Sequence, residues 1–225
     1  MYYKKQFVFK EGKPIPAVVR NYNHKDFNAL IDVQRESFPP PFPPDLLWNE
    51  EQLTNHVGYY PEGAICIEVA GEVVGSITGF LVDFDPEHPE HTWEEVTDNG
   101  YIRNHQPDGR TLYIVDISVK PDYRKMDLGK LLMQAMYERV IQDNLDRVLG
   151  GGRMPGYHRH AGELDPEQYI QQVIEGKLKD PVITFLLRTG RTPVNLVAGY
   201  LDDDESHHYA LLMEWKNPFM EERLG

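Results

Sequence analysis

A strand pattern, a charged turn and a helix pattern follow one another directly between residues 111 and 141. Residues 112–119 are a run of strand formers that ends at Val119. From Leu128 onward, apolar residues recur at the spacing of one helical face, as in an amphipathic helix. Any fold of this chain must therefore place the end of a strand beside the start of a helix, with only a short turn between them.

This junction is well suited to bind an anion. The first N–H groups of a helix have no internal partner and the helix dipole makes them positive, while glycine lets the backbone approach a phosphate closely. Gly129 lies in the first turn, and Lys120, Arg124, Lys125 and Lys130 fall within the same short segment. Because the whole chain has a formal net charge of -13, this local reversal of sign predicts a phosphate site.

Periodicity elsewhere predicts alternating strands and helices. We expect strands at residues 17–20, 64–70, 73–83, 148–154, 192–200 and 207–215, and helices at 23–38, 45–59, 128–141, 165–177 and 181–188, with a further short helix near Trp93. Residues 2–9 alternate aromatic and polar side chains. They form either an extra strand or a contact between subunits, so a homodimer is one interpretation of this segment.

The turn resembles motif A of the GNAT acetyltransferases, V-x-P-x-x-[RQ]-x-x-G-x-[GA], since Val119, Pro121, Arg124 and Gly129 match in order and spacing. The resemblance implies the α/β acyl-CoA N-acyltransferase fold, with a mixed α+β sheet of about seven mostly antiparallel strands and helices on both faces. It also implies a single domain over residues 1–225, with insertions at about 84–110 and 155–180.

A narrower resemblance involves three segments: residues 151–157, 180–182 and 211–215. They are similar to the acetyltransferase-like region fused to carbon-nitrogen hydrolase (nitrilase) domains in bacteria. The resemblance indicates a bacterial protein. Because the sequence stops soon after these segments, we expect no hydrolase domain beside them.

The resemblance assigns acetyl-CoA as the cofactor and names the residues that would bind it. These are Ile117, Ser118 and Val119 beside the pantetheine arm, and Arg124, Lys125, Met126, Asp127, Leu128, Gly129 and Lys130 around the pyrophosphate. Asp127 stands where the family usually has its middle glycine. Because like charges repel, we expect replacement of Asp127 by glycine to tighten acetyl-CoA binding.

The chemistry implied by the family is direct attack of an amine on the thioester in a ternary complex. Asp116 interrupts an apolar strand, and burial would raise its pKa toward the working range of a general base. Alternatively, Asp116 points to solvent. Gly150, Gly151 and Gly152 either keep side chains out of the path of the pantetheine arm or mark a bulge.

The family often places its acid at a tyrosine in an F-Y-x-x-x-G-F segment, and this sequence has no proton donor at that position. Leu186 occupies the position of the tyrosine, and Arg191 that of the final aromatic residue. Tyr157 and His158 are the substitutes that we expect to take part in catalysis. His158, His160 and Glu163 have too weak a spacing for a metal site, and the single cysteine excludes a thiolate zinc cluster, so no metal is expected.

Composition limits the partners of the chain. The strong negative charge argues against nucleic acid and anionic membranes, and no apolar run is long enough for a membrane span, which favours a cytoplasmic protein. The acidic stretches 83–108 and 202–205 would attract a cationic small-molecule or peptide amine acceptor, unless they are simply solvated. The sequence thus predicts an N-acetyltransferase, with a non-catalytic acyl-CoA-binding regulatory or scaffolding module as the alternative.

Overall fold

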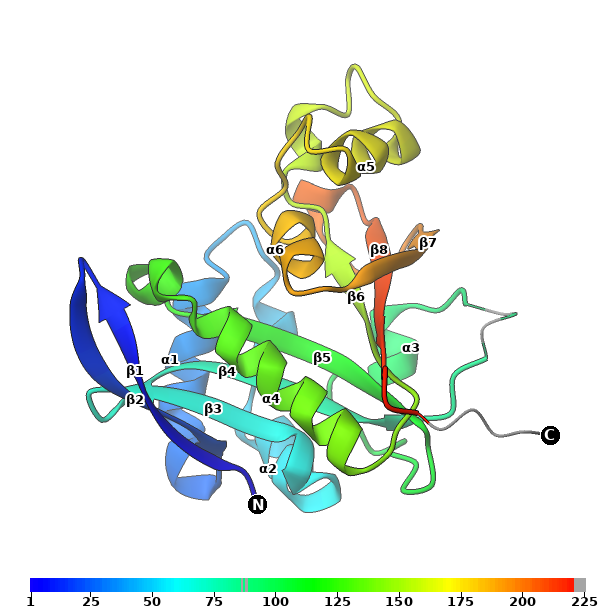
Figure 1. Cartoon of the computed structure of the whole chain (residues 1–225). Coiled ribbons are helices and arrows are strands. Elements are labelled where there is room, and N and C mark those ends of the chain that lie inside the picture. The colour runs from blue at the N-terminus through cyan, green and yellow to red at the C-terminus, as the bar shows by residue number, and fades with distance from the viewer. Residues whose placement is uncertain (86, 88, 221–225) are drawn as a thin grey trace.

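The computed structural model describes residues 1–85, 87 and 89–220. Its strands form one sheet of eight in the order β1-β2-β3-β4-β5-β6-β8-β7, shown in Figure 1. All neighbours are antiparallel except β5 and β6, which are parallel. The strands are β1 (Tyr3–Lys10), β2 (Lys13–Asn21), β3 (Ala64–Val69), β4 (Glu72–Val82), β5 (Thr111–Val119), β6 (Arg147–Arg153), β7 (Thr192–Val197) and β8 (Ala210–Lys216).

Helices cover both faces of this sheet. Helix α4 crosses one face, and α1 and α2 lie behind the other in Figure 1. The mixed, mostly antiparallel sheet expected from the sequence is therefore confirmed, with eight strands where about seven were expected. The helices are α1 (Phe27–Ser37), α2 (Glu50–Tyr59), α3 (Trp93–Thr97), α4 (Leu128–Gln142), α5 (Pro166–Ile174) and α6 (Ile183–Arg188).

The eighth strand is β1, which forms a hairpin with β2 at the sheet edge. Its register runs from Tyr3 opposite Arg20 to Lys10 opposite Lys13. The Tyr2 hydroxyl and the Lys4 ammonium both bond to the Glu138 carboxylate of α4, at 2.9 and 2.7 Å. The interpretation of residues 2–9 as an extra strand is confirmed, and these bonds attach it to the helix.

Apolar side chains at helical spacing build the core on both faces. Leu132, Met133 and Met136 of α4 are fully buried on one face, as are Leu30 of α1 and Leu53 of α2 on the other. Such burial supplies most of the favourable free energy that holds helices on a sheet. Within the described residues, no helix has the length and apolarity needed to cross a membrane.

The sheet opens between β5 and β6. These strands pair at only three positions, the last being Tyr113 opposite Leu149. Beyond that point β5 continues along β4 to Val119, and β6 continues along β8 to Arg153. The far part of β5 thus presents a backbone edge that β6 does not cover.

A bulge in β5 adjoins this opening. Thr78 of β4 lies opposite Asp116 and Gly79 lies opposite Ile114, so Val115 is the extra residue. The indole N–H of Trp93, in the short α3 helix, donates to the Val115 carbonyl at 3.0 Å. A bulge re-aims the side chains beside it, and here it lies next to Asp116.

Candidate active site

A cavity of about 1040 Å³ occupies the opening between β5 and β6. The backbone and side chains of both strands line it, together with the first turn of α4, helix α6 and the loop that follows α1. Ligands commonly bind in such openings because backbone N–H and C=O groups are left without a strand partner there. The cavity therefore joins an exposed backbone edge to a helix N-terminus.

The start of α4 has free amides directed at this cavity. Asp127 caps the helix in the left-handed region, at φ 58°, and makes no side-chain cap bond. Leu131 N–H is the amide that bonds back to the Asp127 carbonyl, at 3.2 Å, so the amides of the preceding first turn have no helical partner. At Gly129, a Cβ atom would lie 3.1 Å from the Phe185 ring, so a larger residue would fit tightly there.

The structure brings most of the predicted cofactor-binding residues to the cavity. Those that line it are Ile117, Ser118, Val119, Arg124, Asp127, Gly129 and Lys130. The side chains of Met126 and Leu128 are buried in the core instead, and Lys125 is exposed outside the lining. Met126 and Leu128 thus have only their backbone available to a phosphate group at this turn.

The basic cluster of the turn is smaller than the sequence indicates. The Lys120 ammonium pairs with the carboxylates of Glu36 and Glu72, each at 3.0 Å, and Lys120 does not line the cavity. The Arg124 guanidinium donates to the carbonyls of Val119 and Ser37, at 3.2 and 2.9 Å. Arg124 thus ties the end of β5 to the end of α1, and Lys120 is removed from the phosphate set.

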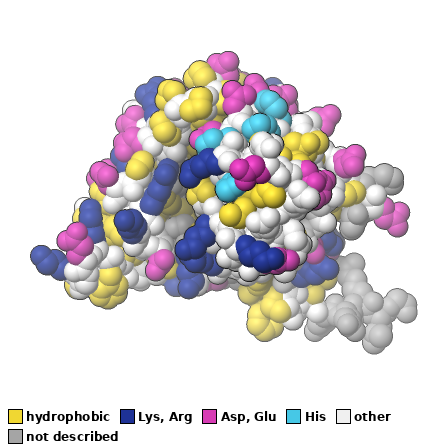
Figure 2. Space-filling model, turned by 90° about the horizontal axis from the view of Figure 1, so that it is seen from above, with side chains coloured by type: hydrophobic (Ala, Val, Ile, Leu, Met, Phe, Trp, Pro, Cys, Tyr) yellow, Lys and Arg dark blue, Asp and Glu magenta, His cyan; other side chains and the backbone are white. Residues whose placement is uncertain are grey.

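Other cations line the cavity from the opposite side. They are Arg153 at the end of β6, Arg159 and Lys179 from the segment around α5, and Arg188 of α6. Figure 2 shows Lys and Arg side chains gathered on both sides of a hollow on this face. Basic groups around a helix N-terminus favour a polyanionic ligand in an otherwise acidic protein.

Asp116 is half-buried on β5 and lines the cavity. The Gln34 amide of α1 donates to its Oδ2 at 2.6 Å and also reaches the Ser118 hydroxyl at 3.3 Å. Burial raises the pKa of the Asp116 carboxyl to about 7, while hydrogen bonds from Ser118 and Gln34 and the charge of Arg153 act in the opposite direction. The inward-facing interpretation of Asp116 is the one that the structure shows.

A chain of three ring groups, which the sequence did not indicate, ends at the cavity. Tyr200 lines the cavity, and its hydroxyl lies 2.7 Å from the Tyr113 hydroxyl. The Tyr113 hydroxyl lies 2.7 Å from Nε2 of His91. Burial raises the pKa of Tyr200 to about 12, so this hydroxyl keeps its proton at neutral pH. These contacts join residues up to 87 positions apart in the sequence, and no local pattern identifies them.

Tyr157 and His158 do not lie where a catalytic acid is needed. The Tyr157 hydroxyl donates to the Leu164 carbonyl at 3.1 Å, and Nδ1 of His158 contacts the Pro155 carbonyl at 2.7 Å. Neither residue lines the cavity. Both side chains stabilise the turn before α5, so the sequence-based assignment of the acid lacks geometric support.

The three glycines of β6 line the cavity for a reason other than the one expected. A Cβ atom on Gly151 would lie 2.3 Å from Cζ of Tyr200, and one on Gly152 would lie 2.7 Å from Leu186. The strand keeps a regular register with β8 throughout, so the glycines do not form a bulge. Gly151 and Gly152 make room for side chains that form the cavity wall, whereas a Cβ atom on Gly150 would lie 3.1 Å from the Ile114 carbonyl oxygen.

Helix α6 offers no proton donor at the position of the family tyrosine. Leu186 lines the cavity with an aliphatic side chain. Arg191 is buried, and its guanidinium donates to the carbonyls of Gly150 and Met213. Arg191 thus links β6 to β8 just where β6 leaves β5.

The two acidic stretches contribute little charge to the cavity. Among the described residues of 83–108, Trp93 is the one that lines it; positions 86 and 88 lie outside the description. In 202–205, Asp203 pairs with Arg153 through two bonds of 2.7 Å, and Glu205 bonds the same guanidinium at 3.2 Å. The first stretch therefore does not supply acidic side chains to the cavity among its described residues. In the second stretch, Arg153 largely neutralises the acidic charge.

The mixed sheet, the free amides at the start of α4 and the cavity agree with the family resemblance of the turn. A model of the acetyltransferase (GNAT) family matches residues 27–161, and the chain belongs to that family. Its sequence is 50% identical to an uncharacterized N-acetyltransferase of Bacillus subtilis, YkwB, over 96% of both chains. It is 40% identical to a probable hydrolase of the same bacterium, YhcX, over 89% of this chain and 38% of that protein.

Solved structures share the fold. A GNAT-like decarboxylase, GphF, in complex with isobutyryl-CoA has a TM-score of 0.73 at 20% identity, over 88% of this chain and 98% of that one. The ribosomal-protein-S18-alanine N-acetyltransferase of Escherichia coli has a TM-score of 0.59 at 12% identity, over 93% and 99%. At these identities the likeness establishes the fold alone. Within the described residues, no group of three or more His, Cys, Asp or Glu side chains could hold a metal ion.

Proposed function

We propose that this acetyltransferase transfers the acetyl group of acetyl-CoA to a primary amine by direct attack in a ternary complex. The observation that carries the proposal is one cavity that joins the free amides of α4 to the inward-facing carboxyl of Asp116. The first feature suits the diphosphate of the donor, and the second suits proton removal from an acceptor.

The donor would lie along the opening of the sheet. Backbone amides of residues 128–130 and the side chains of Arg124 and Lys130 would bind the pyrophosphate. The uncovered edge of β5 from Ile114 to Val119 would hydrogen-bond the pantetheine arm, because its N–H and C=O groups lack a partner on β6. A backbone N–H of this edge would also stabilise the oxyanion formed on attack.

Two side chains would move the protons. Asp116, with its pKa near 7, accepts a proton from the acceptor ammonium, which leaves the nitrogen lone pair free to attack the thioester carbon. When the C–S bond breaks, its electron pair remains on sulfur. The Tyr200 hydroxyl then gives sulfur a proton and regains one from the nitrogen as it becomes an amide. Tyr113 and His91 position that hydroxyl.

The test is release of free CoA thiol from acetyl-CoA in the presence of primary amines, with the acetylated product identified by mass spectrometry. We expect turnover that depends on both substrates and saturates with each. A protein that binds acetyl-CoA but releases no thiol across a broad amine panel would instead act as a non-catalytic acyl-CoA-binding module. The half-buried Asp116 at the cavity, with its raised pKa, favours catalysis over that alternative.

A further inference from the structure

One part of the cavity has walls that are mostly aromatic. We name it the acceptor pocket and define it by Phe38, Phe42, Trp48, Trp93 and Asp116, all of which line the cavity. The rings of Trp48 and Trp93 stack with centroids 6.4 Å apart, and those of Phe38 and Phe42 lie 4.9 Å apart. Two pairs of rings from separate segments thus line the same cavity.

The position of the Trp93 ring relative to Asp116 is fixed by hydrogen bonds. Its indole N–H donates to the carbonyl of Val115, the residue before Asp116, at 3.0 Å. Its backbone N–H donates to the Tyr200 carbonyl at 2.8 Å. An amine whose nitrogen reached the Asp116 carboxyl would therefore place its substituent beside this ring.

The charges around the pocket disfavour a second cation on the acceptor. The Arg153 guanidinium lies 4.7 Å from the centre of the Phe42 ring, on the wall of the cavity. Glu205 lines the cavity but already bonds Arg153, and Asp180 accepts from the Gly156 and Val182 amides and from the Tyr169 hydroxyl. A polyamine would bring further positive charge near Arg153, whose neighbouring carboxylates Asp203 and Glu205 already bond that guanidinium.

We propose, on the basis of the proposed function, that the acceptor is a primary amine with one positive charge and a flat apolar substituent, such as an arylalkylamine. The ammonium binds at Asp116, and the substituent packs between the two aromatic pairs. Burial of an aromatic group against rings is favourable through both its apolar area and ring contacts. This acceptor differs from the cationic amine expected from the acidic stretches, because its recognition depends on an apolar substituent rather than on acidic residues around the groove.

The first experiment compares 2-phenylethylamine, spermidine and ethylamine as acceptors by CoA thiol release at saturating acetyl-CoA. We expect kcat/KM for 2-phenylethylamine to exceed that for each of the others by at least about tenfold, as aromatic burial predicts. A kcat/KM for spermidine equal to or above that for 2-phenylethylamine would overturn the inference and leave the acetyltransferase function standing.

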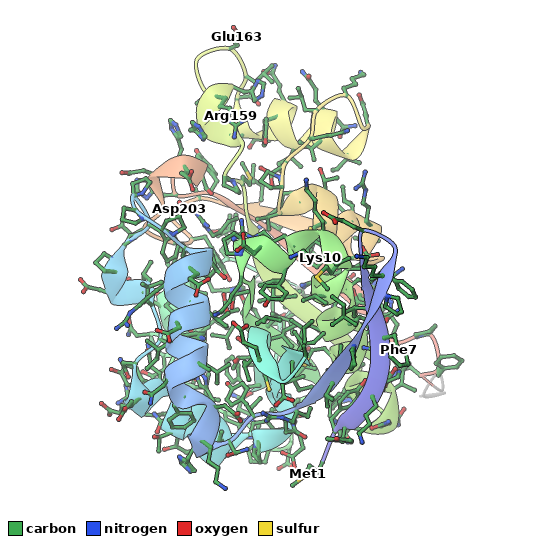
Figure 3. The ribbon with its side chains drawn as sticks, turned by 90° about the vertical axis from the view of Figure 1, so that its left-hand side faces the viewer. Met1, Phe7, Lys10, Arg159, Glu163 and Asp203 are labelled. Carbon is green, nitrogen blue, oxygen red and sulfur yellow. The ribbon has the colours of Figure 1, made fainter. Side chains whose placement is uncertain are left out.

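A variant tests the pocket itself. Phe42 is half-buried at the pocket wall, so Phe42→Ala removes a ring without opening the core. We expect the ratio of kcat/KM for 2-phenylethylamine to that for ethylamine to fall about tenfold, which corresponds to the loss of one ring contact. The matched control is Phe7→Ala, which removes a 66% exposed ring on β1. In Figure 3, Phe7 lies on the β1–β2 hairpin, away from Arg159 and Asp203. An unchanged ratio in Phe42→Ala would contradict the inference.

A binding measurement separates this inference from the proposed function. Calorimetric titration of 2-phenylethylamine into the CoA-saturated protein requires no chemistry. Saturable binding that Phe42→Ala weakens, without thiol release, would keep the acceptor pocket and refute the transferase reaction. Turnover of other amines without binding of 2-phenylethylamine would do the reverse.

Discussion

Asp116 is the residue on which the proposed chemistry most depends. Replacement by asparagine keeps the shape and one oxygen for the Gln34 amide but removes the proton acceptor. We expect Asp116→Asn to lower kcat roughly 10²- to 10⁴-fold, the usual contribution of a general base, with the Kd for acetyl-CoA unchanged. Steady-state kinetics and calorimetry measure the two quantities. Turnover within threefold of the parent would remove Asp116 from the active site.

The same carboxyl predicts a pH dependence of activity and of stability. It must be ionised to accept a proton, so kcat/KM should rise with pH up to about 7 and then level off. Its pKa is higher in the folded state than in the unfolded chain, where it is near 4, so the folded state binds more protons between these values. The stabilisation linked to this group is complete below about pH 4 and lost as pH rises through 7.

Thermal unfolding of the parent and Asp116→Asn checks that sign. The variant lacks the titration, so its Tm relative to the parent should increase from pH 5 to pH 8, by at least about 2 °C for a chain of this size. Both proteins share every other titrating group, which makes the difference specific. A Tm difference that stays constant over this range would show that the Asp116 pKa is not raised.

Asp127 places a carboxylate beside the proposed pyrophosphate site. Its left-handed backbone suits glycine or asparagine at least as well as aspartate. Because like charges repel, we expect Asp127→Gly and Asp127→Asn each to tighten acetyl-CoA binding about fivefold. Asp122→Asn, an exposed acid of the same turn outside the cavity lining, is the calorimetric control. Weaker binding by both Asp127 variants would argue against this placement of the donor.

At the scale of elements, the Tyr200 ring packs so closely against β6 that Gly151 has no room for a side chain. Gly151→Ala would place a Cβ atom 2.3 Å from that rigid ring, and overpacking of this kind costs about 1–3 kcal/mol. We expect urea unfolding to show this loss, accompanied by a fall in kcat because Tyr200 is displaced. Gly162→Ala, where no atom lies within 4 Å and φ is not positive, should be neutral. Equal stability of the two variants would contradict the packing.

Local patterns predict the elements and the donor turn, but not the far side of the cavity. Val119, Pro121, Arg124 and Gly129 lie within one short segment, so their spacing alone identifies the turn. Tyr200 reaches Tyr113 only because β8 pairs with β6 and the preceding loop folds back over the sheet. Such contacts depend on topology, which periodicity does not encode. For the same reason the sequence does not show that Tyr157 and His158 lie outside the cavity lining.

Charge at the scale of elements also misled the sequence interpretation. Lys120 was counted with the phosphate-binding residues, yet Glu36 of α1 and Glu72 of β4 neutralise it. Asp203 was counted with an acidic groove, yet it pairs with Arg153. Both sets of ion pairs join segments that are distant in the sequence. A count of charges along the chain therefore gives the net sign of a region but not the charge that remains after ion pairing.

The whole molecule combines a net charge of -13 with a cavity lined by several cations. This contrast bears on binding of the polyanionic donor rather than on binding of the acceptor. An acidic surface repels polyanions in general, whereas the cavity concentrates positive groups and helix-start amides at one opening. Binding of a polyanionic donor should therefore be confined to that opening and weaken as salt is added.

Calorimetric titration of the purified protein with acetyl-CoA tests the central claim most directly, since every proposed step requires the donor in the opening between β5 and β6. We predict saturable binding at one site per chain, competed by free CoA and weakened when Arg124 is replaced by alanine. Absence of any measurable affinity for acetyl-CoA or CoA at low salt would contradict the account.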